Sequence, residues 1–345
     1  MRAFRIRDKL PEMPKIKWGV LGAAKIAVEK VIPAMQGGAF TDVVAIASRD
    51  AAKARAAADR LGIPTAHGSY EALIADPNVD AIYNPLPNHL HLPWTKAAAE
   101  AGKHVLCEKP LGLTAAEARE LMAIRDRTGV TIQEAFMVWT HPQWRAVVDL
   151  CRSGRIGNVR SYSGVFSYFN DDPTNIRNKV EWGGGGLMDI GCYLVITSRM
   201  VFGEEPRRVM ALVERDASTG VDILSSMMLD YPSGQAVGVC STRITPYQRV
   251  QILGTTHRLE VEIPFNAPND RPCRVWMDDG QDLSGGNVET LTFDTCDQYR
   301  VQGDLLSKAI LDKAPQPYPL EMSVRNMDIL DALFRSAQSG RWQPV

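Results

Sequence analysis

Short apolar runs alternate with amphipathic segments through the first 137 residues of the chain. Five of these runs are too short for buried helices and read as strands, at 17–21, 42–47, 79–83, 105–107 and 129–135. The clearest helix start lies between the last two runs, where Thr114 and Glu117 form a capping-box pattern. Repeated strand–helix alternation predicts an α/β fold with a parallel, doubly wound Rossmann sheet over residues 15–137.

The pattern changes after about residue 138, where longer strands alternate between apolar and polar positions. We expect these strands at 159–168, 208–213, 223–229, 236–242, 249–253 and 258–263. Turns rich in Gly, Pro and Asp separate them, which favours an antiparallel sheet. A helix is predicted at 142–152, and helices at 305–311 and 324–334 close the chain, whereas 267–288 is merely turn-rich. Residues 138–345 are therefore expected to form an α+β domain.

The composition is that of a globular protein with room for two domains, since 345 residues are 45% apolar and 23% charged. A net charge of −1 without a basic block gives no support for a nucleic-acid partner or a membrane surface. Six cysteines without a C-x-x-C pair argue against a metal site or a disulfide framework, so we expect free thiols in a cytoplasmic protein. Residues 1–14 are expected to form a flexible leader, or an arm that rests on a partner subunit.

A glycine-led turn, Gly22–Ala27, follows the first strand. It departs from G-x-G-x-x-G because Ala24 and Ala27 replace the second and third glycines, and a tight turn without a ligand has a similar sequence. Free N–H groups and the positive end of a helix dipole suit a pyrophosphate. The residues expected to bind a dinucleotide here are Gly22, Ala23, Ala24, Lys25 and Ile26.

The end of the second strand indicates which dinucleotide is bound. An acidic residue at this place selects NAD by its bonds to the ribose, whereas an arginine suits the 2′-phosphate of NADP. Here Ser48 and Arg49 follow the strand, and Lys53 lies one helical turn further on. The alternative is an exposed basic helix start, which is unfavourable to the dipole without an anion. We therefore expect NADP, with NAD possible.

Three further segments carry candidate chemistry. Lys109 follows a strand in Ala101–Pro110, at the edge where open α/β sheets bind ligands, although a solvated Glu-Lys pair in a loop is the alternative. The loop Asn84–His91 leaves another strand at the same edge, and its histidines could simply start a helix. Four glycines precede Asp189 and Tyr193, which share one helix face. The alternatives are an aspartate that serves the helix N-terminus and a core tyrosine.

Together these stretches resemble the glucose–fructose oxidoreductase and inositol dehydrogenase family over nearly the whole chain. The motifs that carry the resemblance are Gly22–Ala27, Pro87-Asn88-x-x-His91, Ala101–Pro110 and Gly183–Tyr193. The chain is most similar to the subgroup with dihydrodiol and NADP-linked xylose dehydrogenases, which shares Asp172-Pro-x-Asn175-Ile-Arg177 and a tyrosine at position 193. Inositol dehydrogenases carry a histidine there, which argues against inositol as the substrate.

The resemblance implies that the first domain binds the nucleotide, and that the second binds substrate and carries an open, mainly antiparallel sheet. The outer face of that sheet would form a homodimer or homotetramer. Lys109 would lie beside the nicotinamide, in a pocket lined by Pro85, Leu86, Asn88, His91 and Glu108. The substrate would be bordered by His141, Phe169, Arg177, Asp189 and Tyr193.

These residues lead to a mechanistic hypothesis in which NADP exchanges hydride with a sugar, such as xylose or glucose, or with a related cyclic alcohol. Tyr193 would act as the general acid–base, Lys109 would lower its pKa, and Asp189 would orient the lysine or a second hydroxyl. A glycoside hydrolase that oxidises its substrate transiently and a non-catalytic NADP-binding sensor remain alternatives. The sequence leaves open whether the Lys109–Pro110 bond is cis.

Overall fold

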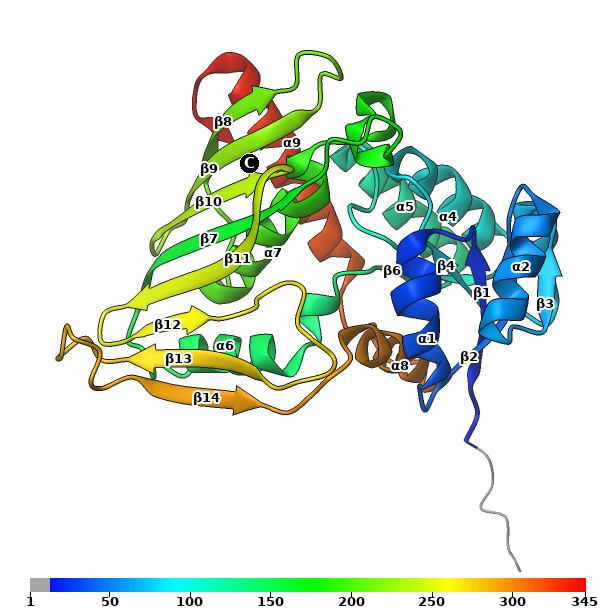
Figure 1. The fold of residues 1–345 in the computed structure, drawn as a ribbon, viewed down its shortest axis with the longest axis horizontal. Helices are drawn as coiled ribbons and strands as arrows, with labels where there is room; N and C mark the ends of the chain where they lie inside the picture. Colours follow the sequence, from blue (N-terminus) through cyan, green and yellow to red (C-terminus); the bar gives the residue numbers. More distant parts are fainter. Residues whose placement is uncertain (1–12) are drawn as a thin grey trace, which may run out of the picture.

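The computed structural model of the protein describes residues 13–345. The predicted leader, apart from Met13 and Pro14, lies outside the described residues. Within them two sheets lie side by side, each with its own helices (Figure 1). This arrangement confirms the predicted fold class.

The first sheet has six parallel strands in the order β3-β2-β1-β4-β5-β6 within the described residues. These are β1 (Ile16–Leu21), β2 (Thr41–Ala47), β3 (Thr65–His67), β4 (Ala81–Asn84), β5 (His104–Cys107) and β6 (Ile132–Glu134). Strand β3 was not predicted, because its three half-buried residues form no apolar run. The chain order reverses between β1 and β4, so the crevice at their carboxyl ends is where this fold binds dinucleotides.

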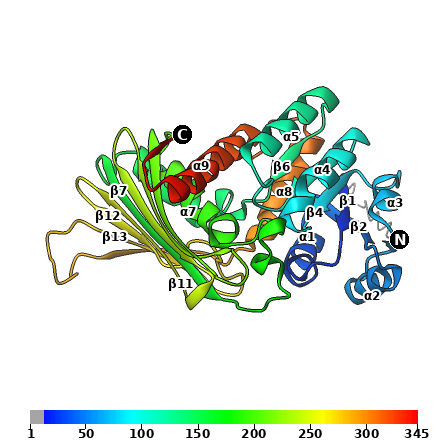
Figure 2. The same cartoon turned by 90° about the horizontal axis from the view of Figure 1, so that it is seen from above.

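Helices cover both faces of the first sheet (Figure 2). They are α1 (Ile32–Gln36) with the π-helical turn Ala27–Val31 before it, α2 (Ala51–Leu61), α3 (Tyr70–Ile74), α4 (His91–Glu100) and α5 (Ala115–Thr128). Thr114 caps α5 as predicted, since its hydroxyl accepts from the N–H of Glu117. The Glu117 carboxylate closes the turn on the N–H of Leu113, one residue earlier than in a standard capping box (2.6 Å).

The second sheet is mainly antiparallel and has the order β14-β13-β12-β11-β7-β10-β9-β8-β15 in the part of the chain described. Its strands are β7 (Val159–Phe169), β8 (Arg208–Arg215), β9 (Asp222–Asp230), β10 (Gln235–Ser241), β11 (Arg243–Gly254), β12 (Arg258–Val261), β13 (Cys273–Asp278), β14 (Glu289–Phe293) and β15 (Gln343–Pro344). Only β7 and β10 pair in parallel among these strands. The description of 267–288 as merely turn-rich was wrong, because β13 lies within it and buries alternate side chains.

Helices α6 (Pro142–Arg152), α7 (Cys192–Phe202) and α9 (Leu320–Ser339) cover one face of the second sheet, and the other face is open (Figure 2). Short helical turns lie at Asn88–Leu90, Met137–Trp139, Ile176–Asn178, Val180–Trp182 and Leu187–Gly191. The stretch Val180–Phe202 is long and apolar enough to cross a membrane, but 89% of its most apolar window is buried, as in a core helix. All six cysteines are free, and five of them are buried.

Helix α8 (Gln298–Leu311) lies beyond the predicted boundary at residue 137 but packs on the first sheet (Figure 1). The indole N–H of Trp18 in β1 donates to Ser307 (3.0 Å), and the Asp304 carboxylate accepts from the N–H groups of Ala39 and Phe40. Trp18 is fully buried by this contact. The core of the nucleotide domain therefore includes a helix from the far end of the chain.

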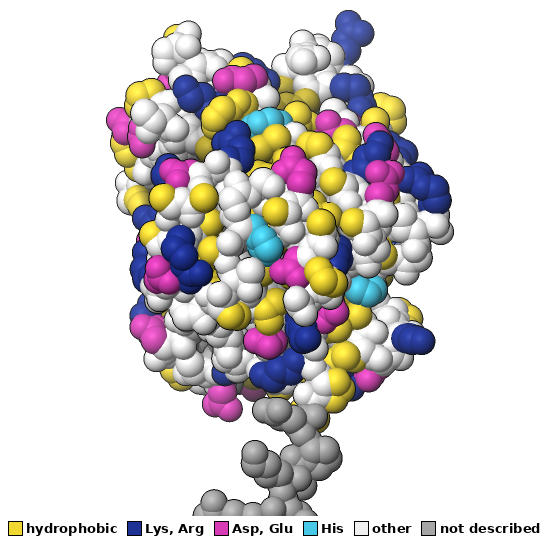
Figure 3. All heavy atoms as spheres, turned by 90° about the vertical axis from the view of Figure 1, so that its right-hand side faces the viewer, with side chains coloured by type: hydrophobic (Ala, Val, Ile, Leu, Met, Phe, Trp, Pro, Cys, Tyr) yellow, Lys and Arg dark blue, Asp and Glu magenta, His cyan; other side chains and the backbone are white. Residues whose placement is uncertain are grey.

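The surface of the first domain carries both signs of charge. On the face shown in Figure 3, lysine and arginine side chains are interspersed with aspartate and glutamate.

Candidate active site

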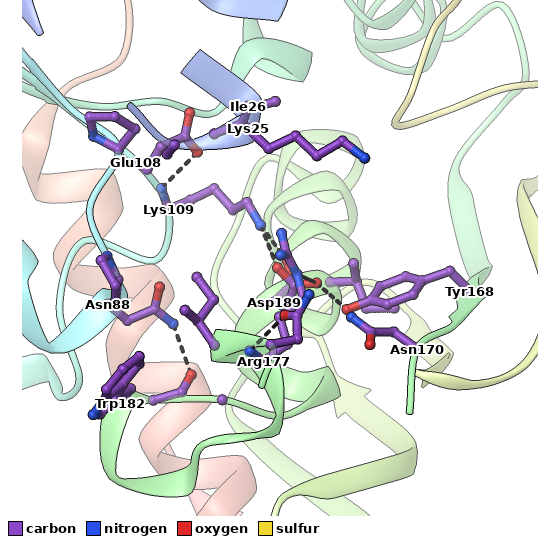
Figure 4. A pocket seen from close by; sticks show the side chains of 18 of the residues that line it. Lys25, Ile26, Asn88, Glu108, Lys109, Tyr168, Asn170, Arg177, Trp182 and Asp189 are labelled. Carbon is purple, nitrogen blue, oxygen red and sulfur yellow. Dashed lines mark hydrogen bonds and ion pairs between the residues drawn. The ribbon is translucent and has the colours of Figure 1, made fainter. Parts of the chain in front are cut away.

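A cleft of about 1100 Å³ lies between the carboxyl edge of the first sheet and the second domain. From the first domain it is lined by the segments after β1, β4 and β5, and from the second by the end of β7, the loop 169–184 and the start of α7. Figure 4 shows side chains from both domains converging on it. The residues predicted from three separate motifs thus lie in one cavity.

The turn after β1 has the shape that a pyrophosphate requires. Gly22 has a φ of 79°, and a Cβ there would meet Leu86 at 3.0 Å. Ala24, Lys25 and Ile26 line the cleft, whereas Gly22 itself is buried beneath the turn. Helical structure begins at Lys25, so the positive end of the helix faces the cavity. These residues fit a bound dinucleotide.

At the end of β2 the basic side chains are exposed, whereas the nearby acidic side chain caps a helix. Arg49 and Lys53 are exposed, and Ser48 is half-buried beside them. The nearby acidic group, Asp50, is occupied as the N-cap of α2, where its Oδ1 accepts from the N–H groups of residues 52 and 53 (3.0 and 3.2 Å). A carboxylate held by the helix is less available for a ribose hydroxyl, while the two cations suit a 2′-phosphate.

The loop after β4 connects the two walls of the cleft. The Asn88 amide donates to the carbonyl of Gly183 in the second domain (2.8 Å), and the ring of His89 packs at a tilt of 31° against Trp182, with 5.1 Å between ring centroids. His91 is fully buried, with its ring nitrogens 2.7 Å from the carbonyls of Leu86 and Pro110. Burial lowers the pKa of His91 to about 4, so the ring is neutral at physiological pH and connects the two loops by its hydrogen bonds. The Lys109–Pro110 bond is cis, which answers the question left open by the sequence.

Four charged or hydroxyl groups meet in the middle of the cleft (Figure 4). The Lys109 ammonium donates to the carbonyl of Asp189 (2.6 Å) and to its Oδ1 (3.2 Å). Arg177 Nε and the Tyr168 hydroxyl both donate to Oδ2, at 2.8 and 2.5 Å. Burial opposes ionisation of Asp189, but the charges of Arg177 and Lys109 outweigh it and hold its pKa below the ordinary value. In return Asp189 outweighs the burial of Lys109 and raises its pKa, so the lysine stays an ammonium.

Tyr193 forms the wall behind this cluster. The Lys109 ammonium lies 5.2 Å from the centroid of its ring. Its hydroxyl donates to Met137 Sδ (3.1 Å), and burial raises its pKa well above the ordinary value. The prediction that Lys109 lowers the pKa of Tyr193 is therefore wrong for this geometry. The Lys109 ammonium is bound to Asp189, and burial of the Tyr193 hydroxyl has the larger effect on its pKa. Lysine and tyrosine nevertheless lie together at one cavity.

The remaining predicted residues have different positions. Glu108 lines the cleft and accepts from the hydroxyl of Tyr83 (2.7 Å); burial raises its pKa. Phe169 lies at the cleft and is 59% exposed. His141 is buried outside the cleft lining, where its Nδ1 caps α6 by accepting from Gln143 N–H (3.2 Å). Burial lowers the pKa of His141 to about 4.

Sequence reasoning missed Tyr168. Its signal was present, because Phe166 and Tyr168 alternate at the carboxyl end of β7 and so point to the same side of the sheet, toward the cleft. A polar aromatic side chain at the end of such a strand can reach a ligand site.

A dinucleotide crevice joined to a lysine–aspartate–tyrosine cluster defines an oxidoreductase that uses a nicotinamide cofactor. Comparison with known proteins agrees. Residues 16–136 match the oxidoreductase family with an NAD-binding Rossmann fold, and residues 144–260 match the GFO/IDH/MocA C-terminal domain. The chain belongs to the GFO/IDH/MocA family, and it is an NAD(P)-dependent oxidoreductase.

Two relatives align over nearly the whole chain. An uncharacterised oxidoreductase of Rhizobium meliloti is 47% identical over 96% of this chain and 100% of its own length. D-xylose 1-dehydrogenase (NADP+) 2 of Haloferax volcanii is 42% identical over 94% of this chain and 98% of its own length.

Two solved structures are similar in fold. A 3-ketoreductase of Actinomadura kijaniata in complex with NADP and TDP-benzene has a TM-score of 0.87 and 30% identity, over 93% of this chain and 98% of that one. The aldose–aldose oxidoreductase of Caulobacter crescentus, complexed with glycerol, has a TM-score of 0.87 and 25% identity, over 96% of this chain and 100% of that one.

Proposed function

We propose that the protein is an NADP-dependent dehydrogenase that oxidises an uncharged aldose, such as xylose or glucose. The observation that carries the proposal is the Lys109 ammonium, held by Asp189 in a cleft formed by the nucleotide crevice and the second domain. The names of the Haloferax xylose dehydrogenase and the Caulobacter aldose–aldose oxidoreductase support a sugar. The exposed Arg49 and Lys53 support NADP.

The charges on the substrate side favour a neutral sugar over a nucleotide-linked one. Two of the cations that line the cleft, Lys109 and Arg177, are both paired with Asp189, whereas Lys25 and Lys30 belong to the nucleotide-binding turn and the helix after it. Asp171 and Asp172 line the same side and are exposed, and only Asp172 is engaged, by Thr174. A diphosphate needs unpaired cations and is repelled by carboxylates. This chain therefore differs in expected substrate from the relatives named as dTDP-sugar reductases.

The mechanism follows from the side chains. When a nicotinamide cofactor is bound, its oxidised ring would accept the hydride from the sugar carbon. Lys109 donates to the sugar oxygen, and Asp189 keeps it charged and in place. Burial keeps the Tyr193 phenol protonated, so in the oxidation it must first release its own proton to solvent, and the phenolate then takes the hydroxyl proton as general base. In the reverse direction the phenol donates this proton to the carbonyl oxygen as general acid. A thioether sulfur is a weak acceptor, so a sugar oxygen can replace Met137 Sδ at the tyrosine hydroxyl at little cost.

Variants of the Actinomadura 3-ketoreductase support these roles. The substitutions in its solved variants change a lysine to alanine or glutamate and a tyrosine to phenylalanine. Those two residues are separated by as many positions as Lys109 and Tyr193 are in this chain.

The test is a panel of aldoses, inositols, dihydrodiols and dTDP-sugars, each with NADP+ and with NAD+, read as reduced nicotinamide. We expect turnover of neutral aldoses with NADP+, and a loss of about two to four orders of magnitude in kcat for Tyr193→Phe. Tyr162→Phe is the matched control, because it removes a buried hydroxyl that bonds Thr197 outside the cleft lining. Full turnover in Tyr193→Phe with an unchanged pH profile would contradict the assignment.

The same panel separates the alternatives. Net hydrolysis of glycosides without accumulation of reduced nicotinamide, with cofactor retained through purification, would identify a hydrolase. Loss of a binding partner rather than of turnover in Lys109→Ala would identify a sensor.

We also propose that the open face of the second sheet joins two subunits. Met228 and Val237 are cross-strand neighbours on this face and are 45% and 43% exposed, and Leu212 on β8 is 77% exposed. An exposed apolar patch on a sheet is typical of an interface. We expect light scattering to show a homodimer for the wild type. The double variant Met228→Lys, Val237→Lys should be a monomer, because two charges then replace apolar side chains on this face. A wild-type monomer at micromolar concentration would refute this.

A further inference from the structure

A fully buried carboxyl group lies next to the segment that carries Lys109. Glu134, the last residue of β6, does not line the cleft. Its Oε1 accepts from the backbone N–H of Leu111 (2.7 Å), two residues beyond Lys109. Its Oε2 has no hydrogen-bond partner within residues 13–345. The Ser323 hydroxyl nearby also has no other hydrogen-bond partner among these residues, so the backbone N–H of Leu111 is the firm contact of this buried carboxyl.

Charged and polar groups on the strands and helices around Glu134 influence the charge of its carboxyl. They are Cys107 on β5, Lys109 after β5, Cys192 and Arg199 on α7, Tyr318 before α9 and Ser323 on α9. Burial raises the pKa of Glu134 to about 7, against the opposing influence of Ser323, the Leu111 N–H, Lys109 and Arg199. The carboxyl therefore gains and loses its charge in the neutral range while it is coupled to Lys109.

We propose that Glu134 is a positioning residue for the sugar oxidation proposed above. It holds the segment after Lys109 through Leu111, and in its ionised form it supports the Lys109 ammonium from inside the protein. Lys109 is thus served by three carboxyl groups: Asp189 at the ammonium, Glu108 at the backbone N–H (3.3 Å), and Glu134 at the N–H two residues further on. Glu134 acts on the reaction only through this segment.

Two substitutions separate the hydrogen bond from the charge. Glu134→Gln keeps an oxygen for the Leu111 N–H but cannot ionise, whereas Glu134→Leu loses both. We expect the wild type to show an inflection near pH 7 in kcat/KM that Glu134→Gln lacks. We also expect kcat at pH 8 to fall about fivefold in Glu134→Gln, with a smaller rise, about twofold, in KM for NADP+. Glu134→Leu should lose more, since Leu111 is released as well.

A binding measurement makes the outcome independent of the substrate. Ionisation of Glu134 places a negative charge behind Lys109, so raising the pH from 6 to 8.5 should shift binding from NADPH toward NADP+, whose nicotinamide ring is positively charged, in the wild type but not in Glu134→Gln. Asp331→Asn is the matched control, because Asp331 also holds a backbone N–H, that of Ala115. A shifted binding ratio without sugar turnover supports Glu134 and refutes the proposed substrate. Identical pH dependence of binding and kcat/KM in wild type and Glu134→Gln overturns the proposal for Glu134.

Discussion

Replacing Glu134 by glutamine is expected to stabilise the protein at alkaline pH and to change its stability less in acid. Burial raises the pKa of this carboxyl from 4.5 to about 7. The folded protein therefore holds the proton more tightly than the unfolded chain, so the stabilisation is complete below pH 4.5 and is lost as the pH rises through 7. At roughly 1.4 kcal/mol for each pKa unit, the buried charge costs about 3 kcal/mol above pH 8. Glutamine avoids that cost.

The measurement is urea unfolding of cofactor-free wild type and Glu134→Gln at pH 5 and pH 8.5, followed by tryptophan fluorescence. The gain in free energy of unfolding should be larger at pH 8.5 than at pH 5 by about 2–3 kcal/mol. Because each protein is compared with itself at two pH values, intrinsic differences between glutamine and protonated glutamate cancel. An equal gain at both values, or a larger one at pH 5, would refute the raised pKa. A confirmed gain, joined to lower turnover, would show that the enzyme sacrifices stability for activity at this position.

Three further substitutions test other parts of the site. Arg49→Ala should raise KM for NADP+ about tenfold and leave KM for NAD+ unchanged, because one charge-assisted contact with the 2′-phosphate is lost; initial-rate kinetics with both cofactors measure this. Tyr168→Phe removes a donor to Asp189 and should lower kcat about tenfold, and a rate equal to that of wild type would show that Arg177 and Lys109 hold the carboxylate without it. Gly185→Ala should destabilise the protein by about 1–3 kcal/mol in urea unfolding, because φ is +114° and the new Cβ would lie 2.0 Å from the Asp222 carboxylate.

Much of the fold follows from local patterns in the sequence. The capped start of α5 at Thr114 and the bounds of α6 were predicted correctly, because capping chemistry and a proline mark them locally. Strand β3 was missed because its three half-buried residues form no apolar run. Strands β13 and β14 were missed because they lie within and directly after a stretch rich in Gly, Pro and Asp, which was taken for turns although β13 alternates. Periodicity reports a strand only where its own residues alternate or are uniformly apolar.

Site residues that belong to a local sequence motif could be predicted, whereas contacts that depend on tertiary packing could not. Lys109 and Asp189 stand out in the sequence, and the structure brings them into contact. The direction of the Tyr193 hydroxyl toward Met137 depends on packing between α7 and the segment after β6, which no spacing reveals. Glu134 looks like an ordinary strand residue, because its importance comes only from burial beside Leu111. Its charge state is therefore a property of the fold rather than of a motif.

Because α8 packs on the first sheet, the N-terminal domain cannot be separated from the rest of the chain by a cut near residue 137. A fragment that ends near residue 137 would leave the indole of Trp18 exposed to water and without its partner on Ser307. It would also lose Leu306 from the core and the carboxylate of Asp304 that receives two backbone N–H groups. Exchange of cofactor modules between relatives by recombination must therefore transfer the segment around 298–311 together with the N-terminal half, or the chimaera will expose apolar surface and aggregate.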